Sequence, residues 1–279
     1  MIPEISASKV AGLIGLHKYQ NADEIAYELL AKDLVGKTKI AEIERAENRH
    51  PFHQLVQQTL REGAIQDIVS GGIKAAQQTK NVQGVLSDVE GQARLVLEMR
   101  HAEMPTELRA RLAEEVRGKV SKQRGLNNED HILNTYEKVH DVKVTERNTK
   151  TIKKDFGTFR LVGRCDGYVA SENRIVDSKD RTRVWPTVPV YDEIQLRCYM
   201  NMYGATEAEL IERFPGGKTR HTKYLADEAV WNSLEQSIRK AVDKLNLAMG
   251  DDEELKRIVY ANTVSLQVDA SGNSVVASA

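Results

Sequence analysis

The chain has 279 residues, of which 40 are Lys or Arg and 41 are Asp or Glu, so its formal net charge is -1. This length suits one large domain with a sizeable core. With 41% hydrophobic residues, 29% charged residues, 18 Gly and 6 Pro, the composition excludes collagen-like and low-complexity classes.

The sequence shows no sign of export or of a membrane partner. No apolar run approaches the roughly 18 residues that a membrane span requires, and the first residues match neither a signal peptide nor a transit peptide. Cys165 and Cys198 are too few for a disulfide framework or for a four-thiolate iron–sulfur cluster. We therefore expect a protein that is not secreted and that works in a reducing compartment such as the cytoplasm.

The first 140 residues have mainly helical patterns. Ser6 or Ser8 can cap a short helix that ends at Gly15. Asn21, followed by Glu24, is typical of a capping box and predicts the start of a second helix.

The segment 38–124 predicts several more helices and contains no chemical signature. We expect it to form a helical insertion or arm. A further helix is predicted after Asn128, and its apolar stripe consists of Ile132, Leu133 and Tyr136.

Beyond residue 140 the hydrophobic period changes from 3.6 to 2, which indicates strands. Strands are predicted over 142–145, 151–154, 158–170, 174–179, 209–214 and 220–225. Helices are predicted over 190–203, 226–249 and 251–261, and a disordered tail over 269–279. We expect residues 1–268 to form a single α/β domain.

Basic residues are concentrated between Arg147 and Trp185, where ten Lys and Arg residues accompany five Asp and Glu residues. A local excess of positive charge is typical of a surface that binds a polyanion. A solvated sheet has a similar composition, so charge alone does not decide between the two.

Two of the predicted strands, 158–170 and 174–179, form a hairpin with acidic residues. If residues 172–173 make a two-residue loop, Asp166 lies opposite Lys179 and Tyr168 lies opposite Asp177. Because side chains alternate along a strand, all four then point to one face of the sheet. This register predicts two carboxylates and a lysine within a few ångströms of one another.

Such a cluster has a definite electrostatic requirement. Two adjacent carboxylates repel, and one takes up a proton unless a cation lies between them. Mg²⁺ typically binds one or two carboxylates together with waters and phosphate oxygens, and a neighbouring lysine can position or activate a water. The alternative is a salt-bridged strand pair on a solvated face, which an isolated Asp/Asp/Lys hairpin would favour.

Two residues outside the hairpin are further candidates. Glu129 precedes Ile132 and Leu133 by three and four positions, so it lies on the apolar face of its helix. It is either a metal ligand or an acid favoured by the helix dipole. Gln195 is aligned with Tyr199 on the helix after the hairpin and could hold a water or a phosphate, although such an amide is also common in structural positions.

The candidate residues occur along the sequence in the order Glu129, Asp166, Asp177-Ser178-Lys179 and Gln195-x-x-x-Tyr199. This order resembles that of the PD-(D/E)XK nuclease superfamily. Within it the chain is most similar to the lambda exonuclease type, the YqaJ-like viral recombination nucleases. The segments that carry the resemblance are 5–15, 125–145, 165–179 and 194–200, whereas 38–124 is unmatched. Cys165 replaces the proline that names the superfamily, and Asp177 replaces its commoner glutamate.

The resemblance implies a restriction-endonuclease-like core, with a mixed central β-sheet flanked by helices and a helical N-terminal insertion. It also implies a Mg²⁺ cofactor, with Mn²⁺ as a substitute. By the same resemblance Lys179 and Gln195 would activate or orient a water, and the metal ligands would be Glu129, Asp166, Asp177 and the carbonyl of Ser178. Candidate DNA contacts are Ser6, Ser8, Arg164, Arg181, Arg183 and Tyr199.

The function that the resemblance implies is Mg²⁺-dependent DNA cleavage, and we favour an exonuclease that acts on double-stranded ends in recombination, repair or replication. The alternatives are an endonuclease or single-strand nuclease of the same fold, and a non-catalytic DNA-binding protein. Expected partners are DNA and a single-strand annealing or recombination protein. A homo-oligomer is left open, because ring-shaped trimers occur among the lambda-type relatives.

Overall fold

The computed structural model describes residues 1–268 and 274–278, with side chains described over 1–265. The helices are η1 (Ala7–Lys9, a 3₁₀ helix), α1 (Val10–Leu13), α2 (Ala22–Leu30), α3 (Leu34–Ala46), α4 (Phe52–Thr59), α5 (Gly63–Gln78), α6 (Val82–Arg100), α7 (Thr106–His140), η2 (Ala170–Glu172, a 3₁₀ helix), α8 (Val190–Tyr203), α9 (Glu228–Ala248) and α10 (Asp252–Asn262). The strands are β1 (Glu4–Ser6), β2 (Arg49–Pro51), β3 (Ile152–Asp155), β4 (Arg160–Gly163), β5 (Gly167–Val169), β6 (Arg174–Asp180), β7 (Glu207–Arg213), β8 (Thr219–Leu225), β9 (Thr263–Val268) and β10 (Ser274–Ser278). Among the described residues, none of the helices combines the length and the apolarity that crossing a lipid bilayer requires.

The central sheet has the strand order β5-β6-β7-β8. Strands β6 and β7 are parallel, whereas β5 and β8 pair antiparallel with their neighbours. The helix α7 packs on one face of this sheet and α8 on the other. The predicted α/β class, with a mixed central sheet flanked by helices, is confirmed.

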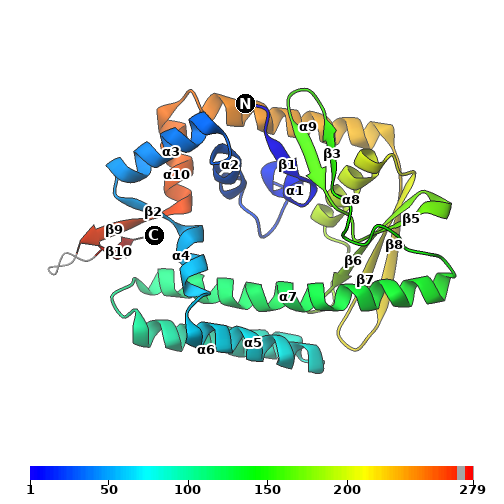
Figure 1. Ribbon diagram of the computed structural model, residues 1–279, viewed down its shortest axis with the longest axis horizontal. Helices are drawn as coiled ribbons and strands as arrows, with labels where there is room; N and C mark the ends of the chain where they lie inside the picture. Colours follow the sequence, from blue (N-terminus) through cyan, green and yellow to red (C-terminus); the bar gives the residue numbers. More distant parts are fainter. Residues whose placement is uncertain (269–273, 279) are drawn as a thin grey trace.

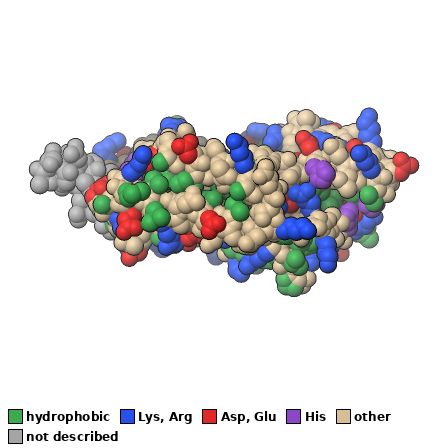
Figure 2. All heavy atoms as spheres, turned by 90° about the horizontal axis from the view of Figure 1, so that it is seen from below, with side chains coloured by type: hydrophobic (Ala, Val, Ile, Leu, Met, Phe, Trp, Pro, Cys, Tyr) green, Lys and Arg blue, Asp and Glu red, His purple; other side chains and the backbone are tan. Residues whose placement is uncertain are grey.

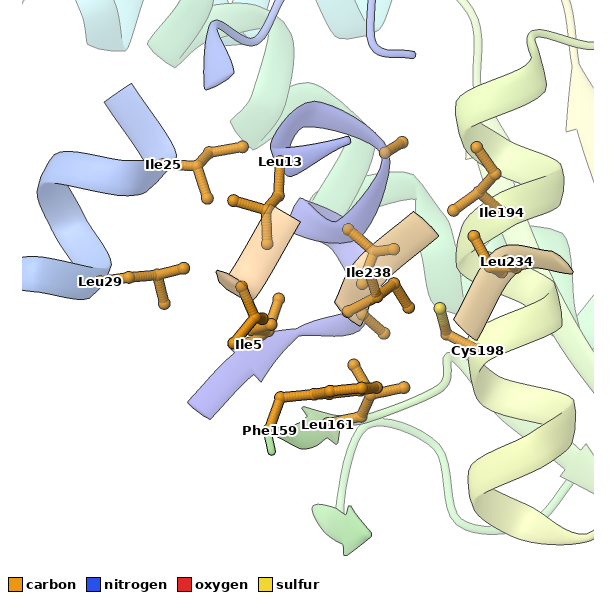
Figure 3. Close-up of a cluster of buried hydrophobic side chains, with 14 of the residues drawn as sticks. Ile5, Leu13, Ile25, Leu29, Phe159, Leu161, Ile194, Cys198, Leu234 and Ile238 are labelled. Carbon is orange, nitrogen blue, oxygen red and sulfur yellow. The ribbon is translucent and has the colours of Figure 1, made fainter. Parts of the chain in front are cut away.

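Alternating residues of β6 serve the two faces. Val176 packs with Ile132 and Tyr136 of α7, whereas Ile175 joins the larger core that includes α8. Figure 3 shows part of this larger core, to which the N-terminal strand, α8 and α9 contribute. Its labelled side chains are Ile5, Leu13, Ile25, Leu29, Phe159, Leu161, Ile194, Cys198, Leu234 and Ile238.

A second layer consists of α5, α6 and the first half of α7. In Figure 1 the helix α7 runs across the lower part of the molecule, with α5 and α6 beneath it and α9 along the upper edge. The lower layer has its own hydrophobic core, which includes Leu86, Leu97, Leu112 and Val120. The segment 38–124 is thus helical, apart from the short strand β2.

The prediction of a separate helix after Asn128 is wrong, because α7 continues without a break from Thr106 to His140. The Asn128 side chain does not cap a helix but donates a hydrogen bond to Asp180 at 2.7 Å. Buried apolar side chains support the helix on both sides of Asn128, from Leu108 to Val120 and from Ile132 to Tyr136. They belong first to the lower core and then to the core under the central sheet.

The predicted register of the hairpin is wrong by two residues. Tyr168 pairs with Ile175, because the connection contains the 3₁₀ turn η2 and ends with Asn173 in the left-handed region, at φ 48°. A shift of two residues leaves the paired residues of β5, Gly167 to Val169, on their predicted faces. Asp166 therefore lies beside Asp177 instead of Lys179.

The predicted strand 158–170 is also interrupted. Its first part, β4, pairs with β1 and β3, and its second part, β5, pairs with β6. Gly163 ends β4 where a Cβ atom would lie 2.6 Å from Cε1 of Tyr199, so only a residue without a side chain allows this approach to α8. The break leaves Asp166 in the connecting segment.

The C-terminal tail was predicted to be disordered over 269–279. Residues 274–278 instead form β10, which pairs antiparallel with β9. The sequence of β10 contains Val275 and Val276, and β-branched residues favour strands. Residues 269–273 and 279 lie outside the described residues.

Candidate active site

The site lies at the end of β6, a strand that is buried because helices cover both faces of the sheet. Asp177 and Lys179 project from one face of β6, and Asp166 reaches them from the segment between β4 and β5. The backbone N–H of Ser178 donates a hydrogen bond to Oδ2 of Asp166 at 2.8 Å, and its hydroxyl lies 3.1 Å from the same oxygen. These two contacts fix the Asp166 carboxylate against β6.

Asp177 is the most deeply buried acid of the site, with 1% of its surface exposed. Its Oδ2 lies 2.7 Å from the ammonium of Lys179. Its Oδ1 is buried and has no hydrogen-bond partner among the described residues. Burial first, and the neighbouring charge of Asp166 second, raise the pKa of Asp177 above its usual range.

The same carboxylates stabilise the charged form of Lys179. Burial by itself lowers the pKa of an ammonium group, but the carboxylates of Asp177 and Asp166 outweigh this effect and raise the pKa of Lys179. The lysine side chain keeps 25% of its surface exposed. It can therefore contact both Asp177 and a molecule that arrives from solvent.

Glu129 comes to the site from the middle of α7, so it is not an acid at a helix N-terminus. The Asn148 side-chain amide donates a hydrogen bond to its carboxylate. Burial and the charge of Asp177 raise the pKa of Glu129. Burial likewise raises the pKa of Asp166, to which the charge of Glu129 contributes. The three carboxylates therefore destabilise one another's charged forms.

This arrangement fits a divalent cation. A buried carboxylate oxygen without a partner, beside two further acids, is a position where a cation would relieve both the missing contact and the mutual repulsion. The oxygens of Glu129, Asp166 and Asp177 do not all lie within 4.8 Å of one another in the described part of the chain. Mg²⁺ commonly keeps several waters, so Asp166 and Asp177 suit direct ligation and Glu129 suits contact through water.

The opposite wall of the site belongs to α8. The Gln195 amide donates a hydrogen bond to the Tyr199 hydroxyl at 3.0 Å. Burial, followed by the charge of Asp177, raises the pKa of Tyr199. Gln195 and Tyr199 are aligned on α8, as their spacing indicated, and Tyr199 is within electrostatic range of the acidic cluster.

The sequence did not identify the residues that hold α7 in place. Asp180, one residue after Lys179, points to the opposite face and forms ion pairs with Arg124 of α7 at 2.8 Å and with Arg213 of β7 at 3.0 Å. Because Glu129 follows Arg124 by little more than one helical turn, this contact sets its position. The available signal in the sequence was Arg124, which lies one helical turn after Val120 and in line with the apolar face of the same helix.

Three of the candidate DNA contacts have distinct surroundings. Arg181 is committed to Asp192 at 2.6 Å and Glu212 at 2.8 Å, so its charge is already neutralised. Arg164 and Arg183 are exposed. Arg183 lies over the Trp185 ring, 4.6 Å from its centroid.

The predicted serine pair stands at the end of β1. Ser6 and Ser8 have their hydroxyl oxygens 3.1 Å apart, and neither caps a helix. The turn η1 and the helix α1 that follow span three and four residues. No side-chain hydrogen bond caps η1, so neither serine has the predicted capping role, and their contact with a DNA phosphate stays a prediction.

A cleft of ≈ 1070 Å³ separates α6 and α7 from the segment that follows β6. Lys119 and Lys122 line it on the α7 side, and Arg183, Trp185 and Tyr19 line it on the other side. Positive charge and aromatic rings thus face the same space, which Glu114 and Glu115 of α7 also line. Arg181, two residues after Lys179 in the sequence, is one of the residues that line this cleft.

Comparison with known proteins gives structural matches only. No family model matches the chain. A search of curated proteins found no significant match. Among solved structures, the chain is similar to an alkaline exonuclease from Laribacter hongkongensis, with 16% identity and a TM-score of 0.41 over 68% of this chain and 92% of that chain. The same enzyme in complex with dAMP matches with a TM-score of 0.39.

A phage-related exonuclease from Haemophilus somnus matches over 94% of this chain and 97% of its own length, with 13% identity and a TM-score of 0.37. The named neighbours are of the kind that the sequence resemblance indicated. With TM-scores below 0.5, these matches assign no activity to this chain.

Proposed function

We propose that this protein is a divalent-metal-dependent deoxyribonuclease of the PD-(D/E)XK type, and that it acts as an exonuclease on the ends of double-stranded DNA. The observation that carries the proposal is the convergence of Asp166, Asp177 and Lys179, with a buried oxygen of Asp177 left without a partner. Asp180, which joins α7 to the sheet, has both of its oxygens paired. An acid pair with an unmet contact supports a cation site and, with it, chemistry on phosphate.

Asp166 and Asp177 would hold the cation, the Ser178 carbonyl is a further candidate ligand, and Glu129 would bind through water. When bound, Mg²⁺ (or Mn²⁺ in its place) would polarise the scissile phosphate and lower the pKa of a water. Lys179 would orient the attacking water and balance negative charge that develops on phosphorus. Gln195 would hold that water through its amide, in an orientation fixed by its bond to Tyr199.

The cleft beside the site supports DNA as the substrate. Its basic residues suit phosphate oxygens, and the rings of Tyr19 and Trp185 suit stacking against bases at a duplex end. Arg183 is better suited to a backbone contact than Arg181, because acids already neutralise Arg181.

The test uses the purified full chain with Mg²⁺ on 5′-phosphorylated linear duplex DNA and on closed circular DNA. We expect the linear duplex to be degraded progressively and the circle to be spared. The same assay in EDTA should show no cleavage. Cleavage of both substrates would instead indicate an endonuclease. DNA binding in a gel-shift assay without cleavage in Mg²⁺ or Mn²⁺ would indicate a protein that binds DNA but does not cut it.

Matched variants connect the activity to the site. Asp166→Asn and Lys179→Ala should abolish degradation but leave most DNA binding intact. The controls are Asp243→Asn and Lys218→Ala, which change the same residue types at exposed positions away from the site. Equal activity in Lys179→Ala and Lys218→Ala would refute the assignment of Lys179.

A further inference from the structure

A second group of potential ligands lies on the opposite face of the central sheet. It consists of His140 at the end of α7, Glu209 on β7 and His221 on β8. One ligand atom from each residue lies within 4.8 Å of the other two. Figure 2 shows histidine side chains at the surface in the right half of the view, the half in which α7 ends.

The topology of the sheet explains this convergence. Ile211 pairs with His221, so Glu209 and His221 are diagonal neighbours on the same face of β7 and β8. That face packs against α7, which brings its last residue over the pair. Asp177 pairs with Leu210 and points the other way, so this group is separate from the proposed active site.

The distances suit a small tetrahedral ion. Nδ1 of His221 lies 3.0 Å from Oε1 of Glu209. With Zn–N and Zn–O bonds of about 2.0–2.1 Å, adjacent ligand atoms are about 3.3 Å apart. The His140 ring stands 5.4 Å from the His221 ring and 4.5 Å from the Tyr136 ring, measured between centroids, so ion binding would require its exposed side chain to turn toward Glu209.

A supporting network already orients the acidic ligand. The second oxygen of Glu209, Oε2, accepts hydrogen bonds from the Tyr136 hydroxyl at 2.7 Å and from Arg174 at 3.0 Å. These bonds leave Oε1 directed toward the histidines. Ligating carboxylates in metal sites are typically held in this way by hydrogen bonds from outside the ligand set.

The nearby charges do not repel a cation overall. Arg174 is shared among Glu172, Glu207 and Glu209, at 2.5, 3.0 and 3.0 Å. Lys223 pairs with Glu207 at 3.2 Å. Three acids against two bases leave a net negative charge before any ion binds. Two imidazoles and one carboxylate select a borderline ion such as Zn²⁺ over Mg²⁺, which prefers oxygen ligands.

We propose that His140, Glu209 and His221 form a binding site for Zn²⁺ or a similar transition-metal ion, with water completing the coordination. In this site Glu209 exchanges its hydrogen bond to His221 for a bond to the metal. The ion links the end of α7 to the β7–β8 hairpin and so fastens the helix that carries Glu129. This site does not depend on the nuclease function.

The experiment measures Zn²⁺ binding by the full chain with isothermal titration calorimetry, in excess Mg²⁺ to occupy the carboxylate centre on the other face. We expect one Zn²⁺ per chain. His221→Ala and His140→Ala should each weaken binding by at least about tenfold. When zinc is absent, His140→Ala should unfold at nearly the same temperature as the unchanged protein, because its side chain is exposed. His221→Ala should unfold at a somewhat lower temperature, because the buried Oε1 of Glu209 loses its hydrogen-bond partner.

The matched control is His131→Ala, an exposed histidine on the same helix that does not belong to the group. It should bind Zn²⁺ as the unchanged protein does. Zinc should raise the unfolding temperature of the unchanged protein and of His131→Ala, but not that of the double variant His140→Ala/His221→Ala. No zinc binding by the unchanged protein, or equal binding by the double variant, would overturn the proposal and leave Glu209 and His221 as a hydrogen-bonded pair only.

Discussion

Two buried aspartates on β6, three positions apart, have opposite surroundings. Asp180 is paired with Arg124 and Arg213 and accepts a further hydrogen bond from Asn128, so both of its oxygens are satisfied. Asp177 contacts Lys179 with one oxygen only, and the other has no partner among the described residues. Both acids have side chains that are 0–2% exposed.

The difference separates a structural acid from a reactive one. Asp180 joins α7 to the sheet through ion pairs with two arginines. Asp177 has one oxygen without a partner among the described residues, and its pKa is raised by burial and by the charges of Asp166 and Asp192. Proteins keep such unfavourable groups mainly where a ligand or a reaction uses them. The paired network therefore positions the site, and the unpaired cluster suits it to bind a cation.

The largest expected effect is on catalysis. Under the proposed function, Asp177→Asn and Lys179→Ala should each lower the rate of DNA degradation by about 10²–10⁴-fold, because one would remove a metal ligand and the other would remove the group that positions the water. Stability should not fall in Asp177→Asn, since the change removes a buried charge beside Asp166. Single-turnover cleavage and a thermal melt on the same samples check both statements. If Asp177→Asn loses activity only because it unfolds, Asp177 would be a structural acid like Asp180.

The second prediction concerns Asp180. Asp180→Ala should reduce the free energy of unfolding by about 3–5 kcal/mol, because Arg124 would stay buried beside Arg213 without a counter-charge. Urea denaturation measures this change. The control is Asp155→Ala, which removes the exposed pair with Arg160 and a hydrogen bond from the Gly157 N–H, and should lower the unfolding free energy by no more than about 1 kcal/mol. A small effect at Asp180 would mean that the network does not hold α7 to β6.

These two aspartates also show what the sequence could and could not predict. The common face of Asp177 and Lys179 followed from strand alternation, which a register shift of two residues preserves. Asp166 joins them from the segment before β5, outside the predicted strand pairing. The register itself depended on the turn at Asn173, whose left-handed backbone no spacing rule indicated. Equally, Asp180 and Arg124 are 56 residues apart in sequence, and only packing of α7 on the sheet brings them together.

The same limit applies to α7. Local signals at Asn128 favoured a helix start, but tertiary contacts on both sides of that residue carry the helix through it. By contrast, the predicted helices over 226–249 and 251–261 are confirmed to within a few residues. Asp227 and Asp251 cap them with side-chain hydrogen bonds, a signal that is local in the sequence.

A third prediction tests whether Glu129 belongs with the reactive acid or with the structural one. Glu129→Gln should raise the Mg²⁺ concentration needed for half-maximal activity by about tenfold, because it removes a charge that acts on the metal from outside its direct ligands. The unfolding free energy should change little, since Gln can still accept the Asn148 hydrogen bond. A Mg²⁺ titration of activity measures the shift. An unchanged requirement for Mg²⁺ would place Glu129 with the structural network.

The smallest effect is expected at the cleft. Arg183→Ala should weaken DNA binding by a few fold and reduce the slope of log affinity against log salt concentration by about 1, as the loss of one phosphate contact does. Arg100→Ala, at an exposed position on α6 away from the cleft, is the control and should leave the slope unchanged. Arg181→Ala should act differently, lowering stability more than the salt slope, because Asp192 and Glu212 would lose their buried partner. If Arg183→Ala and Arg100→Ala have equal salt slopes, Arg183 does not contact a DNA phosphate. The DNA would then reach the acidic cluster by a route other than this cleft.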